Sequence, residues 1–254
     1  MQIRQAFGAA LFAFSSVAGA QSAAARIKTG DAALTARNAP LAMTSYEAAV
    51  AAEPKNVDAL WRAAHAAVIT GEFDAKSRDS LYGVAEAYAR RAIAVDSNNA
   101  WARFALGEAL GRVALTIESP ISKLPYARGV YSNATACLKL DPKSAECAHI
   151  LGVWNAEVMR IDATQRSMAV SFMGATELGE ASWDKAVLYL QRAIKAEPNR
   201  TVHHLDLARV YADMNEPAKA KAEFNAAIKA PVMDYNDPHY KDQAKAGLAA
   251  LTKG

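Results

Sequence analysis

The chain has 254 residues, of which 52% are hydrophobic, and its formal net charge is only +3. This length suffices for a full core, and abundant alanine with only 13 glycines and 9 prolines favours packed helices over sheets. The charges are spread along the chain, without the basic stripe of a nucleic-acid-binding protein or a polybasic membrane anchor. We therefore expect no nucleic acid partner.

The first residues, MQIRQAFGAALFAFSSVAGAQ, have the pattern of a secretory signal peptide. Arg4 precedes an apolar run that ends in the small triplet Ala18-Gly19-Ala20. The run is shorter than the roughly 20 residues that a membrane-spanning helix needs, which disfavours a membrane anchor. Gln21 follows the triplet, so a lipid-modified cysteine is not expected there. The sequence predicts a signal peptide over residues 1–20 and an exported chain, periplasmic or secreted, without stable membrane insertion.

After this segment, residues 21–37 are expected to form a lead-in helix or a partly ordered segment, and residues 38–254 a helical-repeat solenoid. Four segments share a helix end, a turn and a helix start: AVAAEPKNVDALWRAAHA, AIAVDSNNAWARFALGEA, CLKLDPKSAECAHILGVW and AIKAEPNRTVHHLDLARV. Aligned on the turn residues Pro54, Ser97, Pro142 and Pro198, they carry small residues at fixed places on both helices. Small side chains let antiparallel helices approach closely, and proline is tolerated at a helix start.

This pattern resembles the tetratricopeptide repeat, a helical hairpin of about 34 residues that stacks into a solenoid. The turns here lie 43, 45 and 56 residues apart, so each unit is longer than that repeat. The additional residues fall between the two helices of each hairpin, and the longest insert runs from residue 160 to 182. We therefore predict an all-α fold, a right-handed α-α superhelix (tetratricopeptide-like solenoid) with insertions inside the hairpins and a capping C-terminal helix from about Pro238.

A second resemblance lies in HILGVWNAEVMRIDATQRSMAVSFMGATELGEASWDKAVLYLQRAIKAEP, which starts at His149. Its Leu-Gly-x-Trp helix, its arginine-containing insert with Phe-x-Gly, and the Ser-Trp helix start resemble the regulator of microtubule dynamics family, including its bacterial relatives. The likeness covers roughly Ala42 to Leu251. Eukaryotic members of that family are associated with microtubules and organelle contact sites. Because a signal peptide is predicted here, we carry over the fold and not the partner.

Both cysteines flank the turn at Pro142, Cys137 on one helix and Cys147 on the next. Their equal distance from the turn leaves two alternatives open: a disulfide, provided the Cα atoms lie within about 7 Å, or two small buried residues. A zinc site that adds His149 is disfavoured, because a structural zinc ion needs four ligands. No metal is expected.

Enzyme signatures are absent from the sequence. It contains no Gly-x-Ser-x-Gly elbow, no phosphate-binding glycine loop and no His-Glu-x-x-His motif. We expect a non-enzymatic protein without catalytic residues and without a cofactor.

The first helix of each tetratricopeptide hairpin lines the concave face, and this resemblance assigns a groove for a protein or peptide partner. Aromatic anchors in a charged surround are typical of such grooves, because rings bury area at little entropic cost. An open alternative is that these rings pack against the inserts and fill the groove. The predicted groove residues are Trp61, His65, Trp101, Phe104, Glu108, Arg112, Glu146, His149, Glu157 and Arg209.

Two further interpretations concern the longest insert. It could fold over the groove and cover a small-ligand pocket, with or without catalysis, using the apolar Met168, Val170, Phe172 and Met173 as a lid. Alternatively, the insert and the helix near Tyr126 could form a homodimer surface.

Overall fold

The structure is a computed structural model that describes residues 22–251. The predicted signal peptide therefore lies outside the described residues. Within them all regular secondary structure is α-helical. The helices are α1 Ala23–Thr35, α2 Ala39–Ala52, α3 Val57–Gly71, α4 Arg78–Val95, α5 Ala100–Thr116, α6 Pro120–Leu140, α7 Ala145–Arg160, α8 Ala163–Met173, α9 Thr176–Gly179, α10 Trp183–Ala196, α11 Thr201–Asp213, α12 Pro217–Lys229 and α13 Asp237–Leu251.

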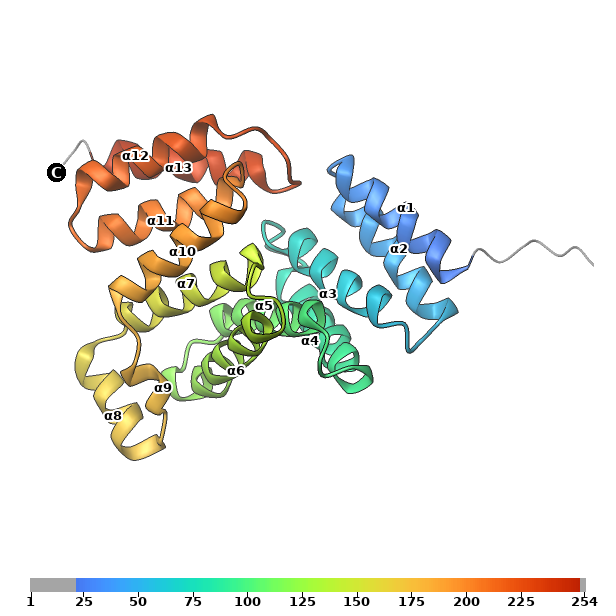
Figure 1. Cartoon of the computed structure of the whole chain (residues 1–254), viewed down its shortest axis with the longest axis horizontal. Coiled ribbons are helices and arrows are strands. Elements are labelled where there is room, and N and C mark those ends of the chain that lie inside the picture. The colour runs from blue at the N-terminus through green and yellow to red at the C-terminus, as the bar shows by residue number, and fades with distance from the viewer. Residues whose placement is uncertain (1–21, 252–254) are drawn as a thin grey trace, which may run out of the picture.

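The helices pack as hairpins that follow one another along a curved solenoid (Figure 1). The pairs are α1 with α2, α3 with α4, α5 with α6, α7 with α10 and α11 with α12, and α13 covers the last pair. The predicted all-α helical-repeat solenoid is thus confirmed. None of the helices in the described range is long and apolar enough to cross a membrane.

The first hairpin begins earlier than residue 38. The lead-in segment forms α1, which packs along α2. Gly30 lies directly against the ring of Tyr46, where any side chain would collide with that ring. Because Gly30 lets α1 pack closely on α2, these two helices form the first hairpin.

Short polar residues start the first helices of three repeats. The side chains of Asn56, Asn99 and Ser144 each accept a hydrogen bond from the backbone N–H three residues later, at the starts of α3, α5 and α7. This N-cap satisfies a backbone donor that has no partner within the helix. The equivalent residue of α11 is Arg200, whose side chain makes no such bond.

The two cysteines form a disulfide between the end of α6 and the start of α7. Their Cα atoms lie 6.1 Å apart, and both residues are buried. Of the two alternatives that the sequence left open, the structure has the disulfide.

The longest insert folds into α8 and α9 at the outer edge of the solenoid, in yellow and gold at the lower left of Figure 1. Ala175 and Leu178 are buried in the core that the N-terminal hairpins share. Arg128 of α6 pairs with Glu177 of α9, with Nε and Oε1 2.8 Å apart. These contacts hold the insert beside α6.

Two hydrophobic clusters divide most of the core. One extends from α1 to α7, and the other joins α10 to α13 with part of α7. Tyr240 and Ala244 of α13 are buried in the second cluster, against which Leu248 and Leu251 also pack. The second cluster additionally receives Phe73, which follows α3. A residue of the N-terminal half therefore packs in the C-terminal core.

Candidate binding groove

The predicted groove residues all lie on first helices of hairpins, namely α3, α5, α7 and α11. The structure separates them into an aromatic cluster near the starts of α3 and α5, a histidine pair between α7 and α11, and a polar region near the helix ends. Glu146 belongs to none of these groups. Its carboxylate accepts a hydrogen bond from the Ser144 hydroxyl at the start of α7.

The aromatic cluster is a stack of rings with one ring half-exposed. Trp61 and Trp101 are stacked, with ring centroids 4.8 Å apart and planes inclined by 15°. Phe104 meets Trp101 edge-on at 5.8 Å. Phe104 is 4% exposed and Trp61 9%, but Trp101 is 41% exposed. The rings thus pack on one another, and Trp101 presents a rigid aromatic surface to solvent.

Trp61 is fixed from two sides. Its indole N–H donates to Asp58 Oδ1 at 3.1 Å, and the guanidinium of Arg62 lies 4.2 Å from the ring centroid. Asp58 also pairs with Arg62 at 3.1 Å. Because Trp61 cannot readily turn, the stacked Trp101 is held in a defined orientation.

His65 connects the aromatic cluster to the charged region of α5. Its ring meets Phe104 at 5.3 Å, and its Nδ1 lies 2.8 Å from Glu108 Oε2. Burial lowers the pKa of His65, but the charge of Glu108 and its hydrogen bond outweigh burial, so the pKa lies above the ordinary 6.5. The charges of Arg200 and Asp234, from the C-terminal repeat, also act on this pKa.

The side chain of His149, on α7, contacts α11 and is largely buried. Its Nδ1 is 3.0 Å from His203 Nδ1, and its Nε2 is 3.4 Å from Asp206 Oδ2. Burial first, and then electrostatic interaction with His203 and with the arginines Arg112 and Arg200, lower the pKa of His149 well below 6.5. His149 is therefore a neutral interior residue near pH 7.

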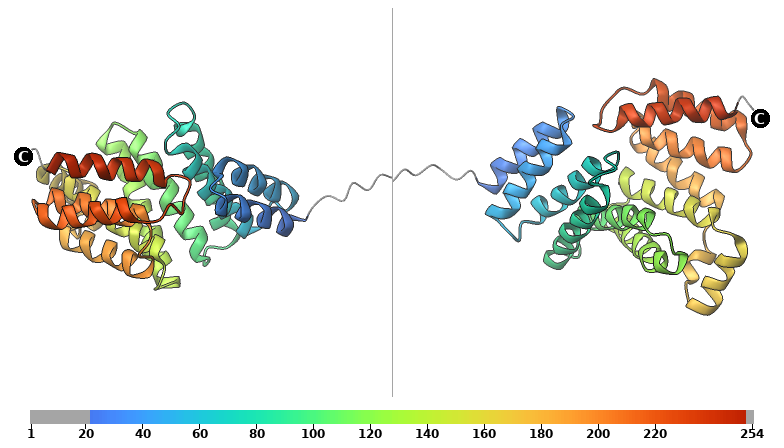
Figure 2. Two further views of the ribbon diagram at one scale, coloured as in Figure 1. Left: turned by 90° about the horizontal axis from the view of Figure 1, so that it is seen from above. Right: turned by 180° about the vertical axis from the view of Figure 1, so that it is seen from behind.

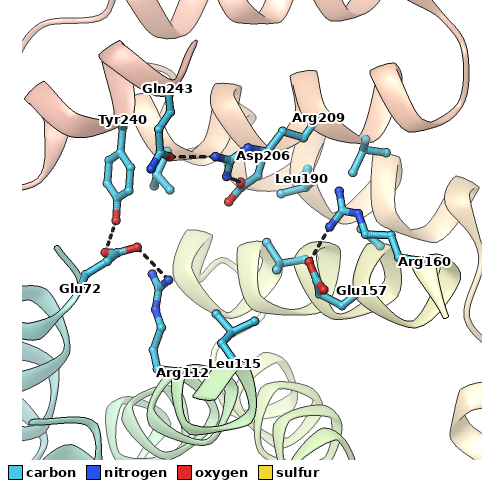
Figure 3. Close-up of a pocket in the computed structure, with 14 residues that line it drawn as sticks. Glu72, Arg112, Leu115, Glu157, Arg160, Leu190, Asp206, Arg209, Tyr240 and Gln243 are labelled. Atoms are coloured by element: carbon cyan, nitrogen blue, oxygen red, sulfur yellow. Dashed lines mark hydrogen bonds and ion pairs between the residues drawn. The ribbon is translucent and has the colours of Figure 1, made fainter. Parts of the chain in front are cut away.

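Glu72 is the centre of the polar region. Its carboxylate pairs with Arg112 at 2.7 Å and accepts a hydrogen bond from the Tyr240 hydroxyl (Figure 3). It also accepts a hydrogen bond from Asn236 Nδ2 at 3.1 Å. Burial, and then the charge of Glu72, raise the pKa of Tyr240 well above its usual value, so the hydroxyl stays protonated and donates. The sequence did not predict Glu72, Asn236 and Tyr240 as part of this face, because they lie outside the repeat positions that define the groove.

A cavity of about 140 Å³ adjoins this region. Arg112, Glu157 and Arg209 line it, as Figure 3 shows, together with Arg160 and Gln243. Arg209 pairs with Asp206 at 2.8 Å and donates to Gln243 at 2.8 Å. Arg160 pairs with Asp213 at 2.6 Å and with Glu157 at 2.5 Å. Each of these arginines already has a carboxylate partner, so the cavity has no unbalanced charge to attract an ion.

The long insert, which was expected to fold over the groove as a lid, does not reach this cavity. No residue from 161 to 182 lines the cavity, because α8 and α9 are held beside α6 at the outer edge. Of the four predicted lid residues, Met168, Phe172 and Met173 are exposed, Phe172 at 83%, whereas Val170 packs against the N-terminal cluster. The cavity is also smaller than the roughly 300 Å³ at which small-molecule pockets begin. This cavity therefore has neither the lid nor the volume that the small-ligand interpretation requires.

The fold and the face just described define a tetratricopeptide-like helical-repeat protein. The model of the family "Regulator of microtubule dynamics protein 1-3" matches residues 26–252, and the chain belongs to this family. It is 26% identical over 151 residues to regulator of microtubule dynamics protein 1 of Bos taurus, covering 58% of this chain and 46% of that protein. The chain thus spans less than half the length of this relative.

Two solved structures are similar in fold. A tetratricopeptide repeat protein of Thermus thermophilus superposes with a TM-score of 0.64 at 16% identity, over 89% of this chain and all of that one. The pilF protein of Pseudomonas aeruginosa superposes with a TM-score of 0.52 at 16% identity, over 91% of this chain and 90% of that one. At these identities the likeness concerns the fold alone.

Proposed function

We propose that this chain is an exported, non-enzymatic scaffold that binds a protein or peptide along α5, with Trp101 as the main anchor. The observation that carries the proposal is the half-exposed Trp101 stacked on the fixed Trp61. A pre-oriented aromatic ring gains contact area on binding without losing much conformational freedom, which is why tryptophan is enriched among binding hot spots.

The second contact in this proposal is Leu115, which is 61% exposed at the other end of α5. Fourteen residues separate Leu115 from Trp101, close to four full turns, so both side chains lie on nearly the same side of the helix. The separation is about 20 Å along the axis. An extended segment of about six residues covers that distance. Between Trp101 and Leu115, Glu108 is paired with His65 and Arg112 is paired with Glu72. A partner therefore gains most from contact with the apolar side chains of Trp101 and Leu115.

Affinity capture from the native cell envelope tests this proposal. The baits are the chain from Gln21 onward, its Trp101→Ala variant and a Phe172→Ala variant. Phe172 is a matched control, because it is an exposed aromatic residue on α8, away from α5. We expect a partner that the wild type and Phe172→Ala retain and Trp101→Ala loses. Equal retention by all three folded baits would exclude Trp101 as the anchor.

Export is the second part of the proposal. It is supported by the signal-peptide pattern of the first 20 residues and by the buried disulfide, since disulfides persist in oxidising compartments. The intact mass of the protein from fractionated cells is the test. We expect a chain that begins at Gln21 in the periplasmic or secreted fraction. A chain that keeps residues 1–20 and stays in the cytoplasm would refute export.

The name of the bovine relative refers to microtubules, and this chain covers less than half of that protein. We propose that the shared feature is the repeat fold and not the partner. Co-sedimentation with assembled microtubules is the check, and we expect the chain to stay in the supernatant. Pelleting with microtubules that the Trp101→Ala variant abolishes would instead identify tubulin as the ligand of α5.

A further inference from the structure

The last connection of the fold reaches back to the first hairpins. The loop between α12 and α13 runs from the C-terminal helices toward α1 and α3, as both views of Figure 2 show. Arg37, between α1 and α2, donates to the backbone oxygen of Val232 at 3.2 Å. Asn236 donates to the backbone oxygen of Ile69 at 3.0 Å. These bonds join residues more than 160 positions apart and close the curve of the solenoid.

The start of α13 adds a polar and an apolar contact at the same place. Tyr240 donates to Glu72, the carboxylate that also holds Arg112. Phe73 stacks on His239 with ring centroids 4.4 Å apart and meets Tyr240 edge-on at 5.5 Å. Two adjacent residues at the end of α3 therefore contact α13: Glu72 through its carboxylate and Phe73 through its ring.

The hairpin of α11 and α12 lacks a side-chain cap at its start, and the residue in that position holds this loop. Arg200 occupies the position where the other first helices carry Asn56, Asn99 and Ser144, and it caps nothing. Its guanidinium pairs instead with Asp234 of the loop and, at 3.4 Å, with Glu197. This departure from the repeat has a structural purpose, because it ties the loop to the start of α11.

The loop is itself folded by one carboxylate. Asp237 is 1% exposed and accepts hydrogen bonds from the backbone N–H groups of Met233 and Asp234, at 2.7 and 2.8 Å. The outward side chains of Val232, Met233 and Tyr235 remain between 39% and 48% exposed. The closure thus depends on a few side chains, unlike the hairpin interfaces, where whole helices pack. Small polar contacts of this kind are where local opening occurs below the free energy of global unfolding.

We propose that residues 230–240 form a latch that opens and closes as a unit on the end of α3, and that the open latch gives a partner fuller access to the α3–α5 face. The second clause rests on the proposed function; the first does not. In the closed latch Glu72 is committed to Tyr240 and Asn236, and Asp234 lies within electrostatic reach of His65. Opening releases these groups on the face that Trp101 borders.

Amide hydrogen exchange on the chain from Gln21 onward tests the latch. Tyr240→Phe removes only the hydroxyl that donates to Glu72, and Asn236→Ala removes the donor to Ile69 and Glu72. Tyr235→Phe makes the same change as Tyr240→Phe at an exposed residue of the same loop and is the matched control. Amides of α6 serve as the internal reference for an intact fold.

We expect the Asn236→Ala/Tyr240→Phe double variant to exchange about tenfold faster or more, in residues 230–240 and at the end of α3 together, since the lost bonds include two to a carboxylate. Tyr235→Phe and the α6 amides should be unchanged. Faster exchange in only one of the two segments, or in neither, would overturn the latch. Tyr240→Phe alone should show the same pattern with a smaller factor, which guards against a double variant that unfolds.

Binding then tests the coupling separately. The probe is a peptide selected from a displayed library on the wild-type chain, whose binding Trp101→Ala weakens. We expect the double variant to bind this peptide at least about twofold more tightly, and equal or weaker binding would overturn the coupling. Failure of the proposed function has a different signature: the exchange result stands, but no selected peptide depends on Trp101.

Discussion

The two ends of the α3–α5 face differ in what their large side chains contact. At the start of these helices Trp61, Trp101 and Phe104 stack on one another and leave one ring half-exposed. At the other end Glu72 and Arg112 are satisfied by each other and by the C-terminal segment. In the proposed function, Trp101 at the start of α5 anchors a partner and Leu115 adds a contact at the far end, whereas Glu72 and Arg112 hold the C-terminal segment.

Phe104→Ala should have the largest effect on this comparison. Phe104 is 4% exposed beneath Trp101, and truncation of a buried phenylalanine costs about 3 kcal/mol or more of stability. It should also release the orientation of Trp101, so that binding falls with stability. Urea unfolding with tryptophan fluorescence measures the first effect. A loss below about 1 kcal/mol would mean that the stack is not part of the core.

Glu72→Ala tests the opposite end. It leaves Arg112, whose side chain is 27% exposed, without its carboxylate, and it removes the acceptor for Tyr240. We expect a loss of about 2 kcal/mol, since removing one partner of a well-buried pair costs about 3–5 kcal/mol and this arginine retains some water. Glu86→Ala is the control, because Glu86 pairs with an exposed arginine one turn away on α4. Equal losses in the two variants would show that the polar end has no special role.

Trp101→Ala should separate binding from stability. The ring is 41% exposed, so its removal should cost less stability than the loss of the buried Phe104, while costing at least about 1 kcal/mol in binding. Parallel unfolding and binding measurements on the same preparation check this. If stability and affinity fall by the same amount, Trp101 acts as a core residue, and the start of the α3–α5 face does not differ from its far end.

The smallest expected effect is on pH dependence, where the two histidines oppose each other. His65 has a raised pKa, so its contribution to stability is complete below the unfolded value near 6.5 and is lost as pH rises through the folded pKa. His149 has a lowered pKa, so its contribution is complete above that value and is lost as pH falls toward the folded pKa. His149→Asn should therefore flatten the loss of stability between pH 6.5 and 5.5, by less than about 1 kcal/mol. An unchanged slope in urea titrations would contradict this assignment.

Much of the fold could be predicted because the helix–turn–helix pattern occurs four times in the sequence. The small residues on either side of each turn specify hairpins, and the spacing of the turns locates the inserts between hairpin helices. The proximity of Trp61 to Trp101 and of Cys137 to Cys147 follows from the same register, and the structure has both contacts.

The closure and the place of the long insert could not be predicted from the repeat. Glu72 and Tyr240 meet across 168 positions through a single hydrogen bond, and no periodic pattern records such a contact. Arg200 was the one available signal, because an arginine stands where three repeats have a capping residue. For the insert, the apolar Met168 and Phe172 suggested a lid, but they are exposed, and Ala175 and Leu178 are the insert residues buried in the core.

The most direct test of the central claim is isothermal titration of the captured partner, or of a selected peptide, into the wild-type chain, Trp101→Ala and Phe172→Ala at one salt concentration. If the start of α5 is the binding end of the inner face, Trp101→Ala weakens binding about fivefold or more and Phe172→Ala leaves it unchanged. Equal affinity of the wild type and a folded Trp101→Ala variant would contradict the account.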